Sequence, residues 1–388
     1  MLQRKKVAAV LRRVRSRLSS AVNEPRVRRR LAKETVPPAI SPFAVYFADT
    51  PRGAYQLEQW LPALDRLAAT GTSVTLLLAN ADTATRLLDS GRLPIVLCTQ
   101  ASAVEDFIAA HQVQVLFYVN NNQANFTTLR INGPYHVHLS HGESEKSSMV
   151  SNQLKAYDVA FIAGPASRER ILHHVRRIDA SHLVEIGRPQ LDLARSVARP
   201  TTDVPVVLYA PTWEGDGPAM AYSSLRENGL DLVRTLCRDP RVRLVFRPHP
   251  KTGTYAAEYA HALHEARQLL GTSSKSPRDG VSAISLADVV VTDISAMAMD
   301  SVGLGKPTVV LSAPAPPEPG IAHRLTDFVT TWPSIPPDVV DRILELAHRG
   351  PDARQRKFRD LVFGPAELGT GTERFIHASH ELLKSVRD

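Results

Sequence analysis

Two histidines stand in loops that follow predicted strands, where they could take part in acid–base chemistry. His141 is followed by Gly142, which lets the backbone turn sharply or approach a ligand closely. An imidazole titrates near neutral pH and can accept a proton from an attacking hydroxyl, so His141 is a candidate general base. His249 lies between two prolines at 247–250, which fixes the direction of its ring. An ordinary loop histidine and a rigid strand exit are the alternative explanations.

Groups suited to phosphate lie close to these histidines in the sequence or follow other predicted strands. Arg247 offers a planar guanidinium that matches phosphate oxygens. Asp293 and Ser295 precede a predicted helix, and a helix N-terminus at the end of a strand can bind a pyrophosphate. Helix capping alone also explains those two residues. Thr212 follows a further strand, and its hydroxyl is a candidate hydrogen-bond donor to a phosphate.

Other candidate contacts to a nucleotide or an acceptor are Gly142, Lys146, Arg188 and Trp213. The indole of Trp213 suits either stacking on a base or packing within a loop. No metal site is predicted, because Cys98 and Cys237 lie in unrelated segments without metal-ligand spacing. They indicate no disulfide framework either, which fits a reducing cytosol.

The elements that must position these residues follow an α/β pattern. Short apolar runs alternate with helical stretches, as in parallel sheets covered on both faces. The predicted strands lie at 43–48, 73–79, 94–98, 114–119, 136–139, 158–163, 205–210, 242–247, 288–292 and 307–312. We therefore expect two doubly wound, Rossmann-like units, with the site in the cleft at the carboxyl ends of their strands.

The predicted domain boundary lies near Arg188, since Gly, Pro and Thr residues interrupt the periodicity over 187–204. This divides the chain into a basic segment at 1–34, an acceptor-side unit at 35–187 and a donor-side unit at 188–388 that ends in helices. Length supports two domains, because 388 residues exceed what a single core usually holds.

Positive charge is concentrated at the start of the chain. Residues 1–34 hold twelve Lys or Arg and two Glu, whereas the whole chain has a net charge of +8, so the remaining 354 residues have a net charge of −2. Nucleic acid is therefore not expected as a partner. Apolar residues at Val7, Leu11, Val14 and Leu18 predict a basic amphipathic helix, too short to span a bilayer. Such a helix favours an anionic membrane surface, and a solvated helix or disordered arm is the alternative.

The order and spacing of six motifs resemble the CDP-glycerol glycerophosphotransferase family, the teichoic acid polymerases and primases. The motifs span about 136 to 311 and are His-Gly at 141–142, Gly-Arg-Pro at 187–189, Ala-Pro-Thr-Trp at 210–213, Arg-Pro-His-Pro at 247–250, Asp-x-Ser at 293–295 and Lys-Pro at 306–307. The resemblance implies a GT-B fold and a CDP-linked donor such as CDP-glycerol or CDP-ribitol. It also implies a lipid-linked or polymeric acceptor and a peripheral position on the inner face of the cell membrane.

The resemblance implies roles for individual residues as well. His141 matches the base that deprotonates the acceptor hydroxyl, Arg247 and His249 match the element near the donor pyrophosphate, and Ser295 matches a residue that meets donor phosphates. Attack on the β-phosphorus would release CMP without a further cofactor, with Arg247, a protonated His249 and the helix end carrying the leaving-group charge. The chain departs from the family in reading His-Gly-Glu-Ser for His-Gly-Thr-Pro, and Asp-Ile-Ser-Ala, with Ala296, for Asp-Tyr-Ser-Ser. The Glu-Ser form is similar to an actinobacterial branch.

Two rival functions share the predicted fold. A GT-B glycosyltransferase or epimerase would use a UDP-sugar and needs an acidic residue late in the second unit, for which Glu318 is the candidate. A non-catalytic scaffold would bind a nucleotide at the membrane without turnover. Product release separates the three, since only the phosphotransferase releases CMP.

Overall fold

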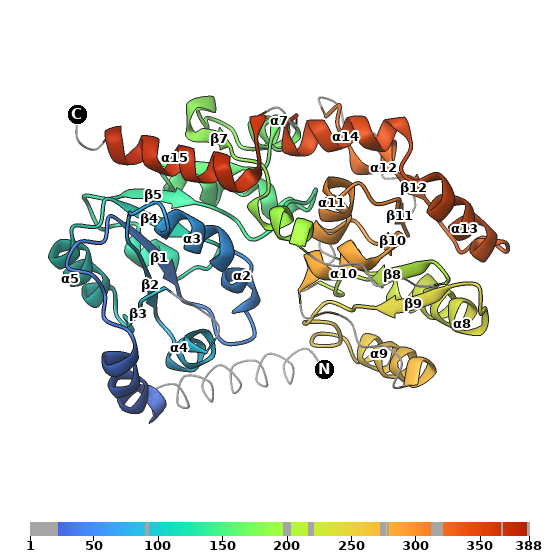
Figure 1. Ribbon diagram of the computed structural model, residues 1–388, viewed down its shortest axis with the longest axis horizontal. Coiled ribbons are helices and arrows are strands. Elements are labelled where there is room, and N and C mark those ends of the chain that lie inside the picture. The colour runs from blue at the N-terminus through green and yellow to red at the C-terminus, as the bar shows by residue number, and fades with distance from the viewer. Residues whose placement is uncertain are drawn as a thin grey trace.

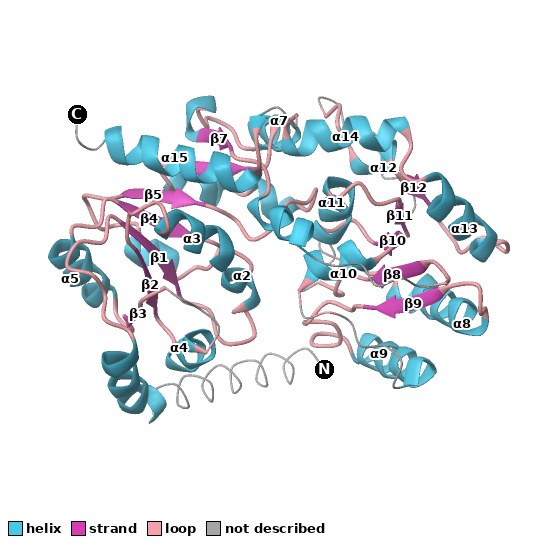
Figure 2. Cartoon of the chain, in the orientation of Figure 1, coloured by secondary structure: helices cyan, strands magenta, loops and turns pink. Residues whose placement is uncertain are grey.

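Two parallel β-sheets, one from each half of the chain, form the centre of the structure (Figure 1). This computed structural model describes residues 22–89, 93–196, 203–215, 221–271, 277, 279–311, 321–365 and 368–385, without the side chains of 147, 148 and 193–196. Helices lie on the outside of both sheets, as Figure 2 shows. The predicted α/β class with two doubly wound units is confirmed.

The sheet of the first unit has seven described strands in the order β3-β2-β1-β4-β5-β6-β7, all parallel. Because the order reverses beside β1, the loops after β1 and β4 meet at a switch point. The strands are β1 Phe43–Phe47, β2 Val74–Leu78, β3 Ile95–Leu97, β4 Val115–Tyr118, β5 Tyr135–His138, β6 Val159–Ile162 and β7 Leu183–Glu185.

Helices cover both faces of this sheet, because successive strand residues point to opposite sides. In β1, Phe43, Val45 and Phe47 pack beneath α3 and α4, whereas Ala44 and Tyr46 pack beneath α5. The helices of this unit are α2 Tyr55–Glu58, α3 Leu61–Ala68, α4 Ala81–Leu88, α5 Ala101–His111, α6 Asn125–Thr128 and α7 Pro165–His174.

The second sheet has five described strands in the order β12-β11-β10-β8-β9, again all parallel. Its switch point lies between β8 and β10, which brings the loops after these two strands together. The strands are β8 Val206–Ala210, β9 Arg243–Phe246, β10 Val289–Thr292, β11 Thr308–Val310 and β12 Thr330–Thr331. The helices are α8 Leu230–Arg238, α9 Ala257–Leu270, α10 Gly280–Leu286, α11 Ala296–Gly303, α12 Leu325–Phe328, α13 Val339–Arg349 and α14 Ala353–Phe363.

The last helix, α15 (Gly371–Ser385), returns from the second unit and crosses the top of the first (Figure 1). Phe375 packs against Trp60 at 5.4 Å and against Phe117 at 5.7 Å between ring centroids, and Leu383 joins the same core. The sequence-based division placed all of residues 188–388 in the second unit, so α15 departs from it. Amphipathic spacing shows that a helix has an apolar face but not which unit that face covers.

Only part of the basic N-terminal segment falls within the described residues. Residues 22–34 form a helix whose Val27 and Leu31 are buried in the core of the first unit. The predicted apolar stripe at Val7, Leu11, Val14 and Leu18 lies outside the described residues, as does Glu318. In the part of the chain that the structure describes, no helix is long and apolar enough to cross a bilayer.

An apolar interface joins the two units beside their cleft. Ala163 and Ala166, at the start of α7, pack with Ile294 and Met299 of the second unit and with Val362 of α14. This apolar interface therefore fixes the relative position of the strand ends of the two units, where the predicted motifs lie.

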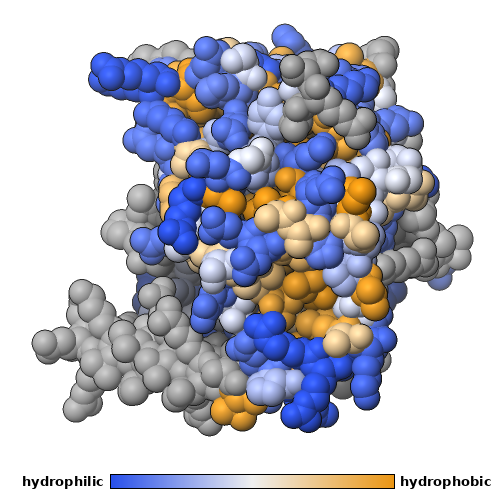
Figure 3. Space-filling model, turned by 90° about the vertical axis from the view of Figure 1, so that its left-hand side faces the viewer, coloured by the Kyte–Doolittle hydropathy of each residue, from blue (hydrophilic) through white to orange (hydrophobic). Residues whose placement is uncertain are grey.

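The outer face of the first unit carries hydrophilic and apolar side chains interspersed (Figure 3).

Candidate active site

Five of the six predicted motifs follow strands, whereas Lys-Pro at 306–307 precedes β11, and the structure brings most of them to one place between the two units. The His-Gly loop follows β5 in the first unit, and the Thr212, His249 and Asp293 loops follow β8, β9 and β10 in the second. Gly142 lies so close to α11 that a Cβ added to it would be 3.0 Å from the Ala296 Cβ. The two strand ends thus face each other across a narrow gap.

A chain of amides orients His141, and sequence reasoning missed it. The carboxylate of Asp49 accepts from Asn120 Nδ2 at 3.1 Å, which fixes the Asn120 amide so that it also donates to Gln56 Oε1 at 2.8 Å. Gln56 Nε2 therefore faces His141 Nε2 at 3.4 Å. Because an amide NH₂ only donates, Nε2 of His141 acts as the acceptor and carries the lone pair. Asp49 and Asn120 follow β1 and β4, so the switch point of the first sheet builds this chain.

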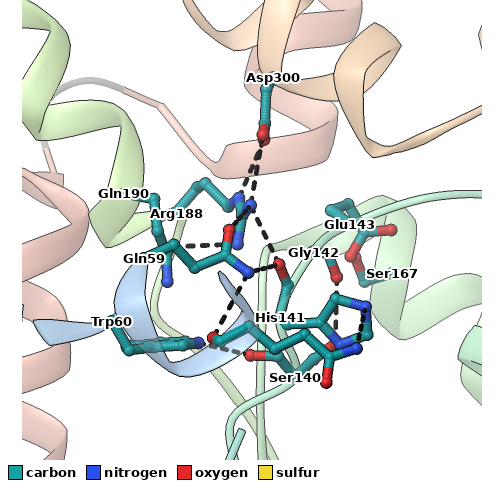
Figure 4. Close-up of polar contacts among 11 residues, drawn as sticks. Gln59, Trp60, Ser140, His141, Gly142, Glu143, Ser167, Arg188, Gln190 and Asp300 are labelled. Atoms are coloured by element: carbon teal, nitrogen blue, oxygen red, sulfur yellow. Dashed lines mark hydrogen bonds and ion pairs between the residues drawn. The ribbon is translucent and has the colours of Figure 1, made fainter. Parts of the chain in front are cut away.

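The backbone around His141 is held as firmly as the ring. Ser140 adopts a left-handed conformation with φ 58°, and its carbonyl accepts from Trp60 Nε1 at 2.6 Å. The His141 carbonyl accepts from Gln59 Nε2 at 2.5 Å and from Arg188 Nη2 at 3.3 Å (Figure 4). Three side chains, two from the turn between α2 and α3 and one from the Gly-Arg-Pro segment, thus fix the loop.

Arg188, a predicted ligand contact, is instead engaged by protein groups. Its Nε donates to Asp300 Oδ1 of α11 at 2.9 Å, and Nη1 donates to Gln190 Oε1 at 3.0 Å. Both charged side chains are buried. Through these hydrogen bonds Arg188 connects the His141 loop of the first unit to α11 of the second (Figure 4).

The ring of Tyr55 lies between the two candidate histidines. Its centroid is 6.3 Å from that of His141 and 6.2 Å from that of His249, edge-on to both.

Burial, with smaller contributions from Arg188 and Lys251, lowers the pKa of His141 to about 4, against a weaker opposite effect of the Val119 carbonyl. Neutral His141 is the form that can accept a proton.

His249 is oriented by its own loop, as the flanking prolines predict. Its Nδ1 accepts from the Lys251 backbone N–H at 3.1 Å, and its ring stacks at 6.1 Å from Trp213. Burial lowers the pKa of His249 to about 3, and the charges of Lys146, Lys251 and others add to this. His249 is therefore neutral in the ligand-free site, and its protonation during departure of the leaving group stays a prediction.

Lys146 reaches from the His-Gly loop into the second unit. Its Nζ donates to Thr212 Oγ1 at 2.8 Å, and burial lowers its pKa to about 8 against the attraction of Asp293. Asp293 is fully buried, and its carboxylate accepts from the backbone N–H of Thr212 at 2.7 Å and of Ser224 at 3.2 Å. Burial raises the pKa of Asp293 to about 7. Asp293 thus shapes the loops around the site and does not reach open space.

The N-terminus of α11 lies beside these loops, with Ser295 at the cap position. Ser295 makes no capping hydrogen bond, and its hydroxyl lies 3.3 Å from that of Thr292. Because the first N–H groups of a helix lack partners within the helix, this end can receive an anion. Arg247 lies near α10 and donates from Nη1 to the Pro277 carbonyl at 2.5 Å. Burial lowers its pKa.

Sequence reasoning missed Glu214, Lys251 and Tyr255, which lie beside the predicted Trp213 and His249. Glu214 accepts from the backbone of Gly253 at 3.0 Å and of Tyr255 at 2.8 Å, so it anchors the loop that carries His249. The Lys251 ammonium lies 5.2 Å from the centroid of the Trp213 ring, a cation–π arrangement. Trp213, Tyr255 and Lys251 form one wall of the site, with Tyr255 half exposed. The acidic Glu214 in Trp-Glu-Gly was the available signal.

Within the described residues, no group of three or more His, Cys, Asp or Glu side chains is arranged to hold a metal ion. The candidate site is instead rich in cations and in hydrogen-bond donors. Lys146, Lys251 and Arg247 are close enough to His249 for their charges to lower its pKa, and Lys251 also acts on His141. This donor set suits a polyanionic ligand such as a pyrophosphate.

The fold and the site define a class of protein before any comparison. Two parallel Rossmann-like units with a cationic cleft at their strand ends form a GT-B-like transferase fold. The family model described as CDP-Glycerol:Poly(glycerophosphate) glycerophosphotransferase matches residues 119–314, half of the chain. The chain belongs to this family and is a transferase. No curated protein sequence matches it.

Solved structures with the same fold come from several enzymes. A putative UDP-N-acetylglucosamine 2-epimerase from Listeria monocytogenes has a TM-score of 0.59 at 14% identity, covering 89% of this chain and 98% of its own. The wall teichoic acid polymerase TagF has a TM-score of 0.54 at 14% identity, covering 97% and 98%. A glycosyltransferase from Rickettsia africae has a TM-score of 0.55 at 11% identity, covering 90% and 99%. At these identities the likeness shows the fold alone.

Proposed function

We propose that the protein transfers a glycerol-phosphate or related phosphoalditol unit from a CDP-activated donor to a hydroxyl of a cell-wall or lipid-linked glycopolymer. The observation that carries this proposal is the pairing of a neutral, oriented His141 with a cationic group around His249 across one narrow cleft. Membership of the glycerophosphotransferase family supports the choice of donor. TagF, which shares the fold, has been solved with CDPG.

The reaction divides naturally between the two units. The acceptor hydroxyl gives its proton to Nε2 of His141 as its oxygen attacks the β-phosphorus of the donor. The bond from that phosphorus to the bridging oxygen breaks, and the electron pair leaves with CMP. Lys146, Arg247, Lys251 and the start of α11 neutralise the charge that develops on the phosphates. Gln56 occupies the direction from which the hydroxyl must approach, so acceptor binding displaces its amide.

Donor binding also changes the state of His249. The nearby cations depress its pKa in the empty site, and two phosphate groups would offset those charges. We expect the pKa of His249 to rise when the donor binds, which lets the imidazole donate to a phosphate oxygen. Trp213 and Tyr255 offer aromatic surface beside the phosphates for the cytosine base.

Product release tests this function directly. Purified protein is incubated with CDP-glycerol, CDP-ribitol or a panel of UDP-sugars, with and without a lipid-linked acceptor, and with magnesium or EDTA. Acceptor-dependent release of CMP that His141→Ala and His249→Ala both abolish is the expected result. Leu172→Trp, a change on the exposed side of α7, is the matched control. Release of UDP instead, or binding without release, contradicts the proposal and identifies a glycosyltransferase or a scaffold respectively.

We further propose that the basic N-terminal segment holds the enzyme on the anionic inner face of the cell membrane. The described end of this segment supports the idea, because Arg26, Arg29 and Lys33 are exposed while Val22 is 79% exposed next to them. Each Lys or Arg near an anionic surface contributes about 1 kcal/mol. A polycation with apolar side chains at its surface suits a peripheral rather than a spanning attachment.

The deletion that tests this attachment must stop before the folded core. Removing residues 1–34 would take away Val27 and Leu31, which are buried, whereas removing 1–21 leaves the described structure whole. We expect the 1–21 deletion to abolish sedimentation with phosphatidylglycerol vesicles and to leave acceptor-dependent CMP release from soluble acceptors intact. Unchanged sedimentation would contradict a membrane role for this segment.

A further inference from the structure

Tyr55 contacts both candidate histidines, one from each unit. Its ring lies 6.3 Å from that of His141 and 6.2 Å from that of His249, at interplanar angles of 87° and 90°. At such distances two perpendicular rings touch edge to face. Tyr55 is half-buried, so part of its ring remains accessible. The ring therefore borders the space between the two imidazoles.

The backbone that carries this ring is held firmly. Tyr55 is the first residue of α2, which lies on the side of the first unit that faces the second (Figure 1). Leu57 of the same helix is buried in the core of the first unit. Gln56 is 7% exposed, and its side-chain oxygen accepts from Asn120 at 2.8 Å. With both following residues anchored, Tyr55 forms a wall that is in place before any ligand binds.

The proposed reaction fixes the directions of the groups around the attacked phosphorus. The acceptor oxygen enters from the side of His141 and CMP leaves on the side of His249, roughly in line. The two non-bridging oxygens and the alditol oxygen point away from that line. Because Tyr55 contacts both histidine rings, it lies beside the line and faces one of these three groups.

Charge decides which of the three groups faces Tyr55. The non-bridging oxygens are negative, so they are drawn to cations such as Lys146 and Arg247 and to the start of α11. Tyr55 offers no positive charge, and burial raises the pKa of its hydroxyl further above neutrality. An alditol is uncharged and has C–H groups that pack on an aromatic ring. The alditol is therefore the group that suits this wall.

We propose that Tyr55 packs against the alditol of the CDP-linked donor and limits the length of alditol that the site accepts. This inference rests on the proposed function, which supplies the donor. A shorter side chain at this position enlarges the space beside the phosphorus, where the far carbons of a longer alditol lie. Tyr55 is thus a specificity-determining residue and takes no part in proton transfer.

Substitutions at this position separate the ring from its hydroxyl. Tyr55→Leu shortens the side chain, and Tyr55→Ala is a second shortened variant in case the first misfolds. Tyr55→Phe keeps the ring and removes only the hydroxyl. The matched control is Tyr135→Leu, because Tyr135 is also half-buried but begins β5, at the end of that strand opposite to the His-Gly loop. Circular dichroism confirms that each variant is folded.

Competition between two donors in one reaction gives the first measurement. CDP-glycerol and CDP-ribitol at equal concentration compete for a synthetic lipid-linked glycerol-phosphate primer, and mass spectrometry measures the ratio of the two products. This ratio does not depend on the fraction of active enzyme, so a merely structural loss leaves it unchanged. We expect both shortened variants to raise the ratio of ribitol to glycerol product at least fivefold over the wild type. In Tyr55→Phe and Tyr135→Leu the ratio should stay within twofold.

Titration calorimetry without acceptor gives the second measurement. CDP lacks the alditol, so it reports on the nucleotide part of the site alone. We expect Tyr55→Leu to weaken the binding of CDP-glycerol at least threefold and to leave the Kd of CDP within twofold of the wild-type value.

The outcomes distinguish this inference from the proposed function. An unchanged product ratio in both shortened variants, an equal change in Tyr55→Phe, or an equal weakening of CDP and CDP-glycerol overturns the role of Tyr55. A wild-type protein that releases no CMP from either donor overturns the proposed function instead, while the titration still decides whether Tyr55 contacts the alditol. A wild-type protein that binds neither CDP nor CDP-glycerol overturns both.

Discussion

The ion pair between Arg188 and Asp300 makes a sharp prediction about how the two units are held together. The Nε to Oδ1 distance is 2.9 Å, and the side chains are 6% and 8% exposed. Removing one charge from such a buried pair leaves the other without compensation, which destabilises a protein by about 3–5 kcal/mol. Asp300→Asn keeps the shape of the side chain and removes only the charge. We expect it to destabilise the protein by about 3 kcal/mol.

Urea unfolding followed by tryptophan fluorescence measures this loss. With a denaturant slope of about 3 kcal/mol/M for a chain of this size, the midpoint falls by about 1 M. The control is Asp338→Asn, because Asp338 pairs with Arg342 on the surface of α13 with both side chains 51% exposed. Exposed pairs are screened by water, so no measurable shift of the midpoint is expected for the control.

A double variant separates the charge effect from packing. Arg188→Met combined with Asp300→Leu removes both charges, and we expect it to recover at least half of the stability that Asp300→Asn loses. Activity should not recover, because the His141 carbonyl also loses the Arg188 donor. A midpoint for Asp300→Asn equal to that of Asp338→Asn would refute this reasoning, since it would mean that the Arg188 charge is compensated elsewhere.

Three further predictions concern the site itself. Gln56→Glu places a carboxylate beside His141, which favours the protonated ring, so the acid limb of the CMP-release profile should move upward from about pH 4 by at least one pH unit. The charge of Lys146 is present below its pKa of about 8 and is lost above it, so the rate should fall in alkaline buffer and Lys146→Arg should shift that fall to higher pH. Gly142→Ala brings a Cβ to 3.0 Å from Ala296, so kcat should drop about tenfold, and adding Ala296→Gly should restore it.

Most of the fold could be predicted from the sequence because its strands are buried on both faces and rich in Val, Leu and Ile. All ten predicted strands are present, within two residues at each end. The two that were missed are β7 at Leu183–Glu185 and β12 at Thr330–Thr331, which are short edge strands. Runs of two or three residues show no periodicity, so no sequence pattern distinguishes them from loops.

The site could be predicted only where a residue follows a strand in its own unit. His141, Thr212 and Asp293 do so, and the topology brings them together. Gln56 could not be found, because its role depends on an amide chain through Asn120 that crosses the switch point. Arg188 was singled out as a possible ligand contact, and only the structure shows that it meets a carboxylate 112 residues away.

The unusual Glu-Ser-Glu form of the His-Gly loop is explained by what each carboxylate holds. Glu143 pairs with Arg170 and accepts from Ser167 at 2.7 Å, both on α7 of the first unit. Glu145 instead accepts from the Leu325 backbone at 2.6 Å, at the start of α12 in the second unit.

Glu143 and Glu145, two residues apart in the loop, are thus anchored to opposite sides of the cleft, and Lys146 also crosses it to reach Thr212. Any opening of the cleft that admits a donor must break the Glu145 and Lys146 contacts together. In this chain the segment that follows the candidate base His141 therefore also joins the two units through Glu145 and Lys146.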